Sequence, residues 1–284
     1  MARAKSVRHD FGSLAEFIEY ADGPSTLEDP YRSSRRMGSR DDSFHASASW
    51  DDAKALAPYW REGADAVDRV RSRITATFAK PVTVIRPSEI GPGALMMADY
   101  VMGSPTPWAR HHKTDQLRAG RKVFRIVVNI SASWNVKPET IQTRGAAVLA
   151  LVDALERSGR RCEIVAVAAF ANKYDYSKAE GIGPKAEYRV TVKGAQRRVS
   201  LPTIAFALAH PSMLRRFMFS ALEIGGEYEL ALTRSSYGYP ANTGVDPDEL
   251  YLGCMGGNDP VWSSPERASE WVRARAAEQG VTLS

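Results

Sequence analysis

The sequence is poor in the residues that build zinc centres and disulfide frameworks, and it has no long apolar run. Two of its 284 residues are cysteines, Cys162 and Cys254, which lie far apart in apolar segments. Two such residues suit reduced thiols in a cytoplasmic protein better than a disulfide. No stretch approaches roughly 18 uninterrupted apolar residues, so we expect no membrane span. The basic N-terminus is not followed by an apolar run and does not indicate a secretory signal.

Signatures of common enzyme classes are also missing. No GxGxxG motif follows the first buried strand, and GCMGG at 253–257 lacks the Lys-Ser/Thr of a phosphate-binding loop. No GxSxG elbow is present to expose a serine nucleophile. His111 and His112 lie in a polar segment and are expected to be solvated, because ligand histidines need oriented partners. The sequence therefore favours a protein without enzymatic activity.

The charge balance is only modestly basic. Lys and Arg number 38 against 33 acidic residues, which gives a net charge of +5 and a pI near 9.2. A hydrophobic fraction of 44% is that of an ordinary globular protein. The excess charge permits contact with nucleic acid or acidic partners but does not argue for it.

Residues 1–120 predict an irregular, mostly helical region. Residues 11–20 have apolar side chains at helical spacing, with Ser13 expected as the N-cap and Glu16 three residues later. Ser49 opens a second helix, since Asp52 completes a variant of the capping box. The other elements expected here are a loop at 22–42, helices at 51–56, 65–78 and 94–102, a strand at 82–86, and a polar connector at 108–120. A domain boundary is predicted near Gly120.

Residues 121–284 predict an α/β domain, with a Rossmann-like parallel sheet and helices on both faces. Residues 122–128 and 162–170 are apolar and β-branched, as strands buried on both faces are. A helix at 140–157 joins them into a βαβ unit, whose crossover is almost always right-handed. The other elements expected are strands at 188–193 and 250–254, a helix at 201–222 broken at His210-Pro211, a strand or helix end at 228–233, a loop at 235–244, and a last helix from Pro265 to about residue 279.

Polar loops follow several of these strands, and ligands bind at the carboxyl ends of strands in open parallel sheets. The first loop reads Asn129-Ile130-Ser131-Ala132-Ser133, a second contains Thr203, and a third contains Asp259. This set resembles the von Willebrand factor A domain, where Asp-x-Ser-x-Ser, a Thr and a later Asp hold Mg²⁺ or a similar ion. The resemblance covers residues 122–259. It implies a metal site made by Asn129, Ser131, Ser133, Thr203 and Asp259, with Asp246 as a poorer alternative to Asp259.

Asn129 stands where that family has an aspartate. The replacement removes one negative charge and keeps a carbonyl oxygen, which weakens a site for Mg²⁺ or Mn²⁺. Alternatively, Asn129 and the two serines hydrogen-bond the loop and cap the following helix, as Asn and Ser do routinely. The sequence leaves both interpretations open.

The whole chain is similar to uncharacterised proteins of tailed bacteriophages and prophages, through FGSLAEFIEYAD, SWDDAKAL and the run from RIVVNISAS to GRRCEI. This similarity implies a viral origin and a location in the host cytoplasm, but no activity. The predicted function is a protein-interaction module that binds a host or phage protein through a degenerate metal-ion-dependent adhesion-type site.

Two alternatives remain open: a metal-dependent hydrolase on the same edge, and a nucleic-acid-associated protein whose arginines contact phosphates. The arginines proposed for that role are Arg32, Arg35, Arg36, Arg197, Arg198, Arg215 and Arg216.

Overall fold

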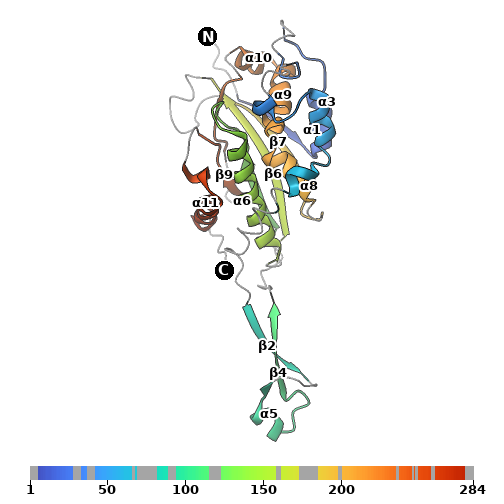
Figure 1. Cartoon of the computed structure of the whole chain (residues 1–284), viewed down its shortest axis with the longest axis vertical. Coiled ribbons are helices and arrows are strands. Elements are labelled where there is room, and N and C mark those ends of the chain that lie inside the picture. The colour runs from blue at the N-terminus through green and yellow to red at the C-terminus, as the bar shows by residue number, and fades with distance from the viewer. Residues whose placement is uncertain are drawn as a thin grey trace.

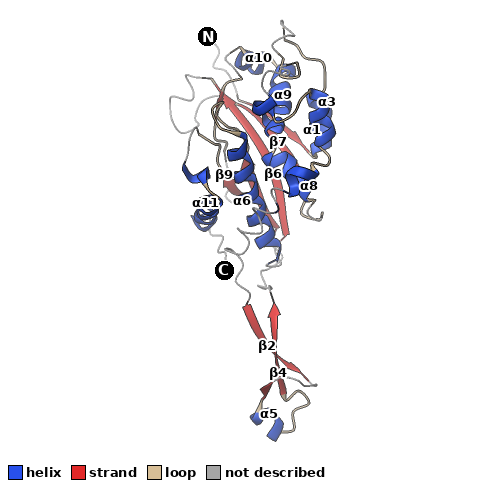
Figure 2. Ribbon diagram, in the orientation of Figure 1, coloured by secondary structure: helices blue, strands red, loops and turns tan. Residues whose placement is uncertain are grey.

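A computed structural model describes most of the chain (Figure 1, Figure 2). The described residues are 6–27, 33–36, 42–65, 68, 82–88, 94–114, 123–157, 161–172, 185–197, 200–234, 237–244, 246, 249–256 and 260–278. For 82–88, 109–114 and a few further residues within these ranges, the structure describes the backbone but not the side chains. The predicted helix at 65–78 falls almost wholly outside these ranges.

The main sheet has six strands in the described part of the chain, and they run in both directions (Figure 2). Along its main path lie β1 (Val7–Phe11), β7 (Ala186–Lys193), β6 (Arg161–Ala171), β5 (Val123–Asn129) and β9 (Glu249–Leu252), while β8 (Tyr239–Pro240) pairs with β6. The pairs β1–β7, β5–β6 and β5–β9 are parallel, and β6–β7 is antiparallel. The sheet is therefore mostly parallel, but β1 and β7 run opposite to β5, β6 and β9.

The predicted βαβ unit is confirmed. Helix α6 (Pro138–Arg157) connects β5 to β6, and these strands pair in parallel from Val123↔Arg161 to Asn129↔Val167. Strand β9 lies parallel on the other side of β5. The strand predicted at 188–193 is present as β7, but its direction differs from that of a parallel sheet because it pairs antiparallel with β6.

One continuous core joins the sheet to the helices. Strand residues that point to one face, such as Ile126, Ile164 and Val190, share this core with the helices. Among the helices that contribute are α1 (Leu14–Ala21), α3 (Trp50–Leu56), α6, α8 (Leu201–Ala209), the π-helix η2 (Met213–Met218), α9 (Phe219–Ile224), α10 (Glu227–Thr233) and α11 (Pro265–Glu278). In the described residues, these helices thus gather on one face, whereas the sequence predicted helices on both.

The opposite face of the sheet is polar around a small apolar cluster. Val127, Val165 and Val167 form that cluster. Beside it, the buried Arg189 forms ion pairs with Glu187 at 2.6 Å and Glu249 at 3.4 Å. No described helix contributes to the cluster, against which Tyr251 of β9 packs.

The helical segment after β7 is interrupted at the predicted place. Helix α8 ends at Ala209, and a π-helix, η2 (Met213–Met218), precedes α9. π-Helical turns are rare and often mark sites with special requirements. Here Arg215 and Arg216, although adjacent, are both turned inward and are 2% and 1% exposed. The shorter helices α2 (Asp42–His45) and η3 (Pro260–Ser263) also belong to the body.

The N-terminal region does not form the mostly helical region that was predicted. It begins with β1, which pairs with β7 in the main sheet. Phe11 and Phe17 belong to the same core as the strands. The predicted caps are confirmed, since Ser13 accepts a hydrogen bond from the Glu16 N–H and Ser49 accepts one from the Asp52 N–H. The boundary near residue 120 lies outside the described residues and stays a prediction.

A second, three-stranded sheet forms an arm. Strand β4 (Trp108–Thr114) lies between β2 (Val82–Ser88) and β3 (Ala94–Leu95) and is antiparallel to both. Helix α5 (Met97–Val101) follows β3 and ends before Gly103, whose φ of 70° is the left-handed conformation common after helices. Figure 1 shows the arm at one end of the long axis, apart from the main sheet. The connector predicted at 108–120 is wrong for 108–114, which form a strand.

Candidate functional site

The predicted site loop lies at the carboxyl edge of β5, β6 and β9, where its side chains are engaged by the protein itself. The Asn129 side chain donates to the Ala241 carbonyl at 2.8 Å and to the Tyr251 hydroxyl at 2.9 Å, and its Oδ1 accepts from the Ser131 N–H. The Ser131 hydroxyl donates to the Ala169 carbonyl and accepts from the Ala169 N–H. Both residues are fully buried. They therefore tie the β5 loop to its neighbours, as the alternative interpretation predicted for the loop, but none of these hydrogen bonds caps helix α6.

A buried arginine lies next to these residues at the same edge. Arg144 of α6 donates to the backbone carbonyls of Asn129, Leu252 and Gly253, and its guanidinium lies 5.6 Å from the ring centroid of Trp262. Burial lowers its pKa to about 10, so the group stays charged at neutral pH. Because its described partners are carbonyl groups and not carboxylates, Arg144 binds together the loops after β5 and β9.

Of the remaining predicted ligands, Thr203 does not join Asn129 and Ser131. Thr203 follows β7, which runs antiparallel to β6, so it lies at the opposite edge of the sheet. Its hydroxyl donates to the Pro58 carbonyl at 3.0 Å. The Ser133 N–H donates to the Met255 carbonyl, and Asp259 is outside the described residues. The structure thus separates Thr203 from Asn129 and Ser131, and the described residues contain no cluster of three His, Cys, Asp or Glu suited to a metal.

The arginines proposed for phosphate contact do not form a surface patch in the described residues. Arg215 donates to the carbonyls of Phe44 and Val136, and Arg216 donates to Ser34 and Ser47. These two side chains bond Ser34, Phe44 and Ser47 to η2 instead of facing solvent. Of the others, Arg35 donates to the carbonyls of Ala21, Asp22 and Gly23, Arg36 and Arg197 are exposed, and Arg32 and Arg198 are outside the described residues.

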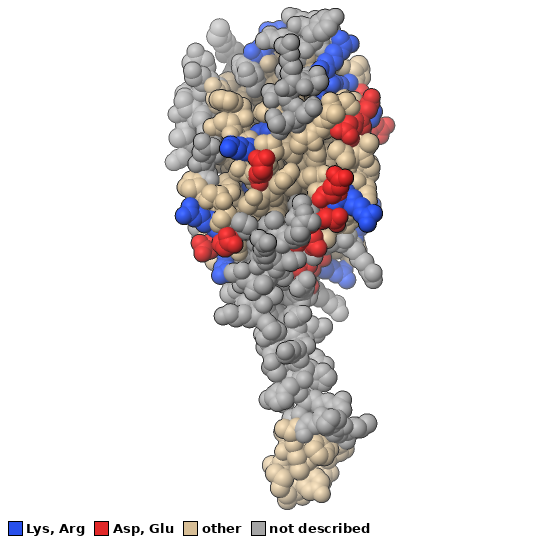
Figure 3. Space-filling view, viewed as in Figure 1, with Lys and Arg blue, Asp and Glu red and all other residues tan. Residues whose placement is uncertain are grey.

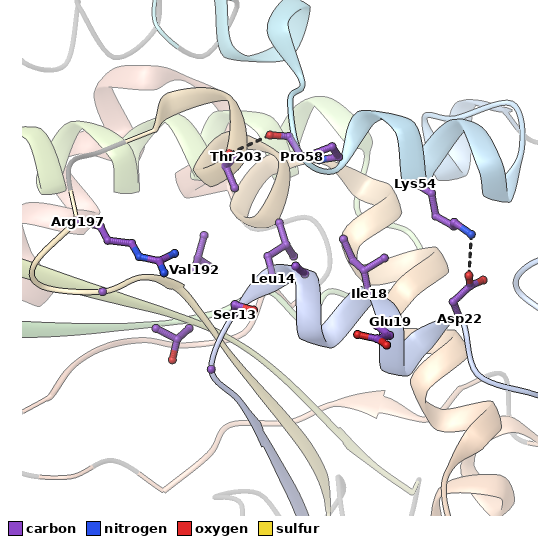
Figure 4. A pocket seen from close by; sticks show the side chains of 14 residues that line it. Ser13, Leu14, Ile18, Glu19, Asp22, Lys54, Pro58, Val192, Arg197 and Thr203 are labelled. Carbon is purple, nitrogen blue, oxygen red and sulfur yellow. Dashed lines mark hydrogen bonds and ion pairs between the residues drawn. The ribbon is translucent and has the colours of Figure 1, made fainter.

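A cleft of about 710 Å³ lies at the other edge, where β1 and β7 end (Figure 4). Leu14 and Ile18 of α1 and Val192 of β7 give it an apolar floor. Thr203 and Pro58 form the rim that Figure 4 shows above them. Ligand pockets commonly have volumes of roughly 300–1,000 Å³. The size of this cleft is therefore that of a binding site.

The charges around the cleft differ in how they are paired. Lys54 and Asp22 form an ion pair at 2.6 Å, and Trp50 Nε1 donates to Asp22 at 2.8 Å. Burial acts to raise the pKa of Asp22, but the hydrogen bonds from Lys54 and Trp50 outweigh it and leave that pKa below its ordinary value. The exposed side chains of Arg197 and Glu19 have no ion-pair partner among the described residues. The cleft thus has one neutralised pair and two charges available to a ligand.

A buried polar cluster anchors β1 to α10. Glu229, 2% exposed, accepts hydrogen bonds from the Tyr188 hydroxyl and the Gly226 N–H, and it pairs with His9 Nε2 at 2.7 Å. Burial would raise the pKa of Glu229, but these hydrogen bonds lower it below its ordinary value. Burial also raises the pKa of Tyr188. Every oxygen of this carboxylate has a partner, so the cluster stabilises the fold.

The tip of the arm is the most apolar part of the described surface. Nine large hydrophobic side chains are exposed in the described residues, and six of them fall within 95–102. They are Leu95, Met96, Met97, Tyr100, Val101 and Met102. In Figure 3, no charged residue is visible on this tip. The other exposed large hydrophobic side chains are scattered. One of them, Trp134, lies just after the predicted site loop and is 81% exposed.

Sequence reasoning missed the arm and the cleft for different reasons. The run ALMMADYVMG was assigned a helix, but a short apolar helix in sequence looks the same whether it is buried or exposed. The alternation of Val7, His9 and Phe11 is a strand signal, but Phe11 was assigned to the following helix. Because β1 was not predicted from the sequence, the cleft that forms between α1 and the ends of β1 and β7 could not be predicted either.

The fold and its surfaces define a mixed α/β protein with one helix-covered sheet and a projecting antiparallel arm. Residues 2–281 match the model of a family described as a domain of unknown function, DUF7192, and the chain belongs to that family. No curated protein and no solved structure matches the chain significantly. Among the described residues, no helix is long and apolar enough to cross a membrane.

Proposed function

We propose that this protein is a protein-interaction module that binds a partner protein through the apolar tip of its arm, residues 95–102. The supporting observation is the clustering there of six of the nine exposed large hydrophobic side chains of the described residues. Contiguous exposed apolar surface is costly in water and marks interaction sites. A protein partner that covers the tip removes this cost.

The side chains of α5 suit this task. Met97, Tyr100 and Val101 are spaced i, i+3 and i+4, which places them on one face of the helix. This spacing is the one by which amphipathic helices insert into hydrophobic grooves. Methionine side chains are flexible and adapt to irregular partner surfaces. The tip therefore favours a partner with an apolar groove.

This proposal keeps one prediction from the sequence and leaves others aside. Protein binding is retained, whereas the geometry gives no support to an ion bridging from Asn129, Ser131 and Thr203. The nucleic-acid alternative has little support, because Arg215 and Arg216 are buried. A relationship to von Willebrand factor A domains, a bacteriophage origin, a cytoplasmic location and bound Mg²⁺ or Mn²⁺ stay predictions.

The test compares two exposed surfaces. Cross-linking to the full-length protein, followed by mass spectrometry, identifies the partner, which is then purified and titrated by calorimetry. The tip variant is Met97→Asp/Val101→Asp, and the matched control is Trp134→Asp, which introduces a carboxylate on the exposed loop after β5. Because both sites are exposed, neither change should unfold the protein.

We expect the tip variant to bind at least about tenfold more weakly, since apolar anchors at interface centres contribute about 2 kcal/mol or more. The control should bind like the wild type. If only Trp134→Asp weakens binding, the partner docks at the carboxyl edge of β5 and the proposal is wrong. Equal affinity for all three proteins also contradicts it.

A further inference from the structure

The cleft at the ends of β1 and β7 shares no lining residue with the arm tip, and its lining combines an apolar floor with charged side chains. Its floor, made by Leu14, Ile18 and Val192, is apolar and packs on the core. Figure 4 shows Arg197 at one end of the cleft and the Lys54–Asp22 pair at the other. The cleft is therefore elongated, with an apolar centre between charged ends.

Each end presents one available charge. Arg197 lies on the loop after β7, and Glu19 lies on α1 on the side of the Lys54–Asp22 pair (Figure 4). Neither has an ion-pair partner in the described part of the chain, whereas Asp22 is already neutralised by Lys54 and hydrogen-bonded by Trp50. A ligand thus meets a cation at one end and an anion at the other.

We propose that the cleft binds a short zwitterionic ligand of the peptide class, with an apolar body over Leu14, Ile18 and Val192. Its carboxylate faces the Arg197 guanidinium, and its ammonium group faces Glu19. A guanidinium offers a rigid fork of donors that suits a carboxylate. A small ligand matches the cleft volume of about 710 Å³.

Simpler ligands fit less well. A purely apolar molecule leaves the charges of Arg197 and Glu19 without partners, and a polyanion such as a nucleic acid meets two carboxylates, Glu19 and Asp22. A divalent cation would need several oxygen ligands at one point. In the cleft, Asp22 is already taken by Lys54 at 2.6 Å. The pairing of opposite charges across an apolar floor is specific to a zwitterion.

The experiment uses trileucine as the probe, titrated into the full-length protein by calorimetry at pH 6.5, where both peptide ends are charged. Two modified probes remove one charge each: N-acetyl-trileucine lacks the ammonium and trileucine amide lacks the carboxylate. The protein variants are Arg197→Gln and Glu19→Gln. Their matched controls, Arg267→Gln and Glu270→Gln, lie on α11, which contacts α6 and β9, the strand at the opposite end of the sheet from β1.

We expect saturable binding of trileucine, weakened about two- to fivefold by each cap and by each cleft variant, the range expected for exposed ion pairs. Arg197→Gln should not weaken binding of the amide further, and Glu19→Gln should not weaken binding of the acetylated peptide further, because the paired charge is already absent. The α11 controls should bind like the wild type.

Absence of saturable binding up to the solubility limit of trileucine would overturn the proposal. Equal affinity for all three peptides would also overturn it, since the ends would then make no contact. Neither outcome bears on the proposed binding of a partner by the arm, because Met97→Asp/Val101→Asp tests that separate surface.

Discussion

The two edges of the main sheet differ in what occupies them. At the ends of β5, β6 and β9, Asn129 and Ser131 are fully buried and Arg144 fills the space between the loops. At the ends of β1 and β7, a cleft of about 710 Å³ remains open. Polar residues after a strand therefore do not by themselves indicate a site, because the same residue types serve to close an edge.

Strand direction explains the difference. Strand β7 is antiparallel to β6, so the chain that follows it, including Arg197 and Thr203, emerges at the edge opposite to Asn129. The β1–β7 edge is widened by α1, which starts directly after β1 and turns Leu14 and Ile18 toward the cleft. Because β7 runs antiparallel to β6, the predicted ligands Asn129 and Ser131 lie at the packed edge, whereas Thr203 lies at the open edge.

The largest effect is expected from Arg144→Met, which removes the group that holds the packed edge together. The carbonyls of Asn129, Leu252 and Gly253 lose a charged donor. We expect the free energy of unfolding to fall by about 3 kcal/mol, because buried acceptors left unpaired are costly. Urea denaturation measures it. Arg267→Met on α11 is the control, and a loss for Arg144→Met as small as in this control would mean that the edge is not closed by Arg144.

Asn129→Asp comes next and also tests the metal prediction. The substitution restores the aspartate of the von Willebrand pattern but removes the donor to the Ala241 carbonyl and Tyr251 hydroxyl. We expect a loss of about 2 kcal/mol, since a buried carboxylate replaces a donor. Melting temperatures with Mg²⁺ and with EDTA should agree for both proteins. A melting temperature of Asn129→Asp raised by Mg²⁺ would contradict the description of this edge as packed, because an ion that binds the native state stabilises it.

A smaller and pH-dependent effect is expected from Glu229→Gln, in the buried cluster with His9 and Tyr188. The pKa of Glu229 in the folded protein is below its ordinary value of 4.5, so its carboxylate stabilises the fold above that pH. The stability difference between wild type and variant should be about 1.5 kcal/mol at pH 7. It should shrink as the pH falls below 4.5 through the lowered pKa. Urea denaturation between pH 7 and pH 3 checks this, and a difference that grows toward acid pH would refute it.

The smallest effect is expected from Thr203→Val. The Thr203 hydroxyl bonds the Pro58 carbonyl at the open rim, where water replaces a lost partner. We expect a change within about 0.5 kcal/mol, as for most surface substitutions. Ser131→Ala, which removes a buried hydroxyl of similar size, should cost more in the same denaturation experiment. Equal losses in the free energy of unfolding for the two variants would contradict the description of one edge as packed and the other as open.

The sequence predicts local elements well and their assembly less well. The strands at 122–128 and 162–170, the helix between them, the break at His210-Pro211 and the last helix from Pro265 all follow from hydrophobic spacing and caps. The direction of β7 does not, because an alternating strand pattern is the same in parallel and antiparallel pairing. Arg215 and Arg216 were expected in a basic surface patch, whereas both are buried in a π-helix, which the sequence did not predict. Thr203 was predicted from its local context alone, which carries no information on the edge where it lies.

The most direct measurement is a cross-linking test of the double variant Ser131→Cys/Thr203→Cys in a Cys254→Ala background. A disulfide needs Cα atoms within about 7 Å, which two ligands of one metal site would allow after small adjustments. We predict that oxidation leaves both new thiols unpaired in mass spectra, and that a water-soluble thiol reagent labels Thr203→Cys much faster than the buried Ser131→Cys. An intramolecular disulfide between the two positions would contradict the assignment of Ser131 and Thr203 to opposite edges of the sheet.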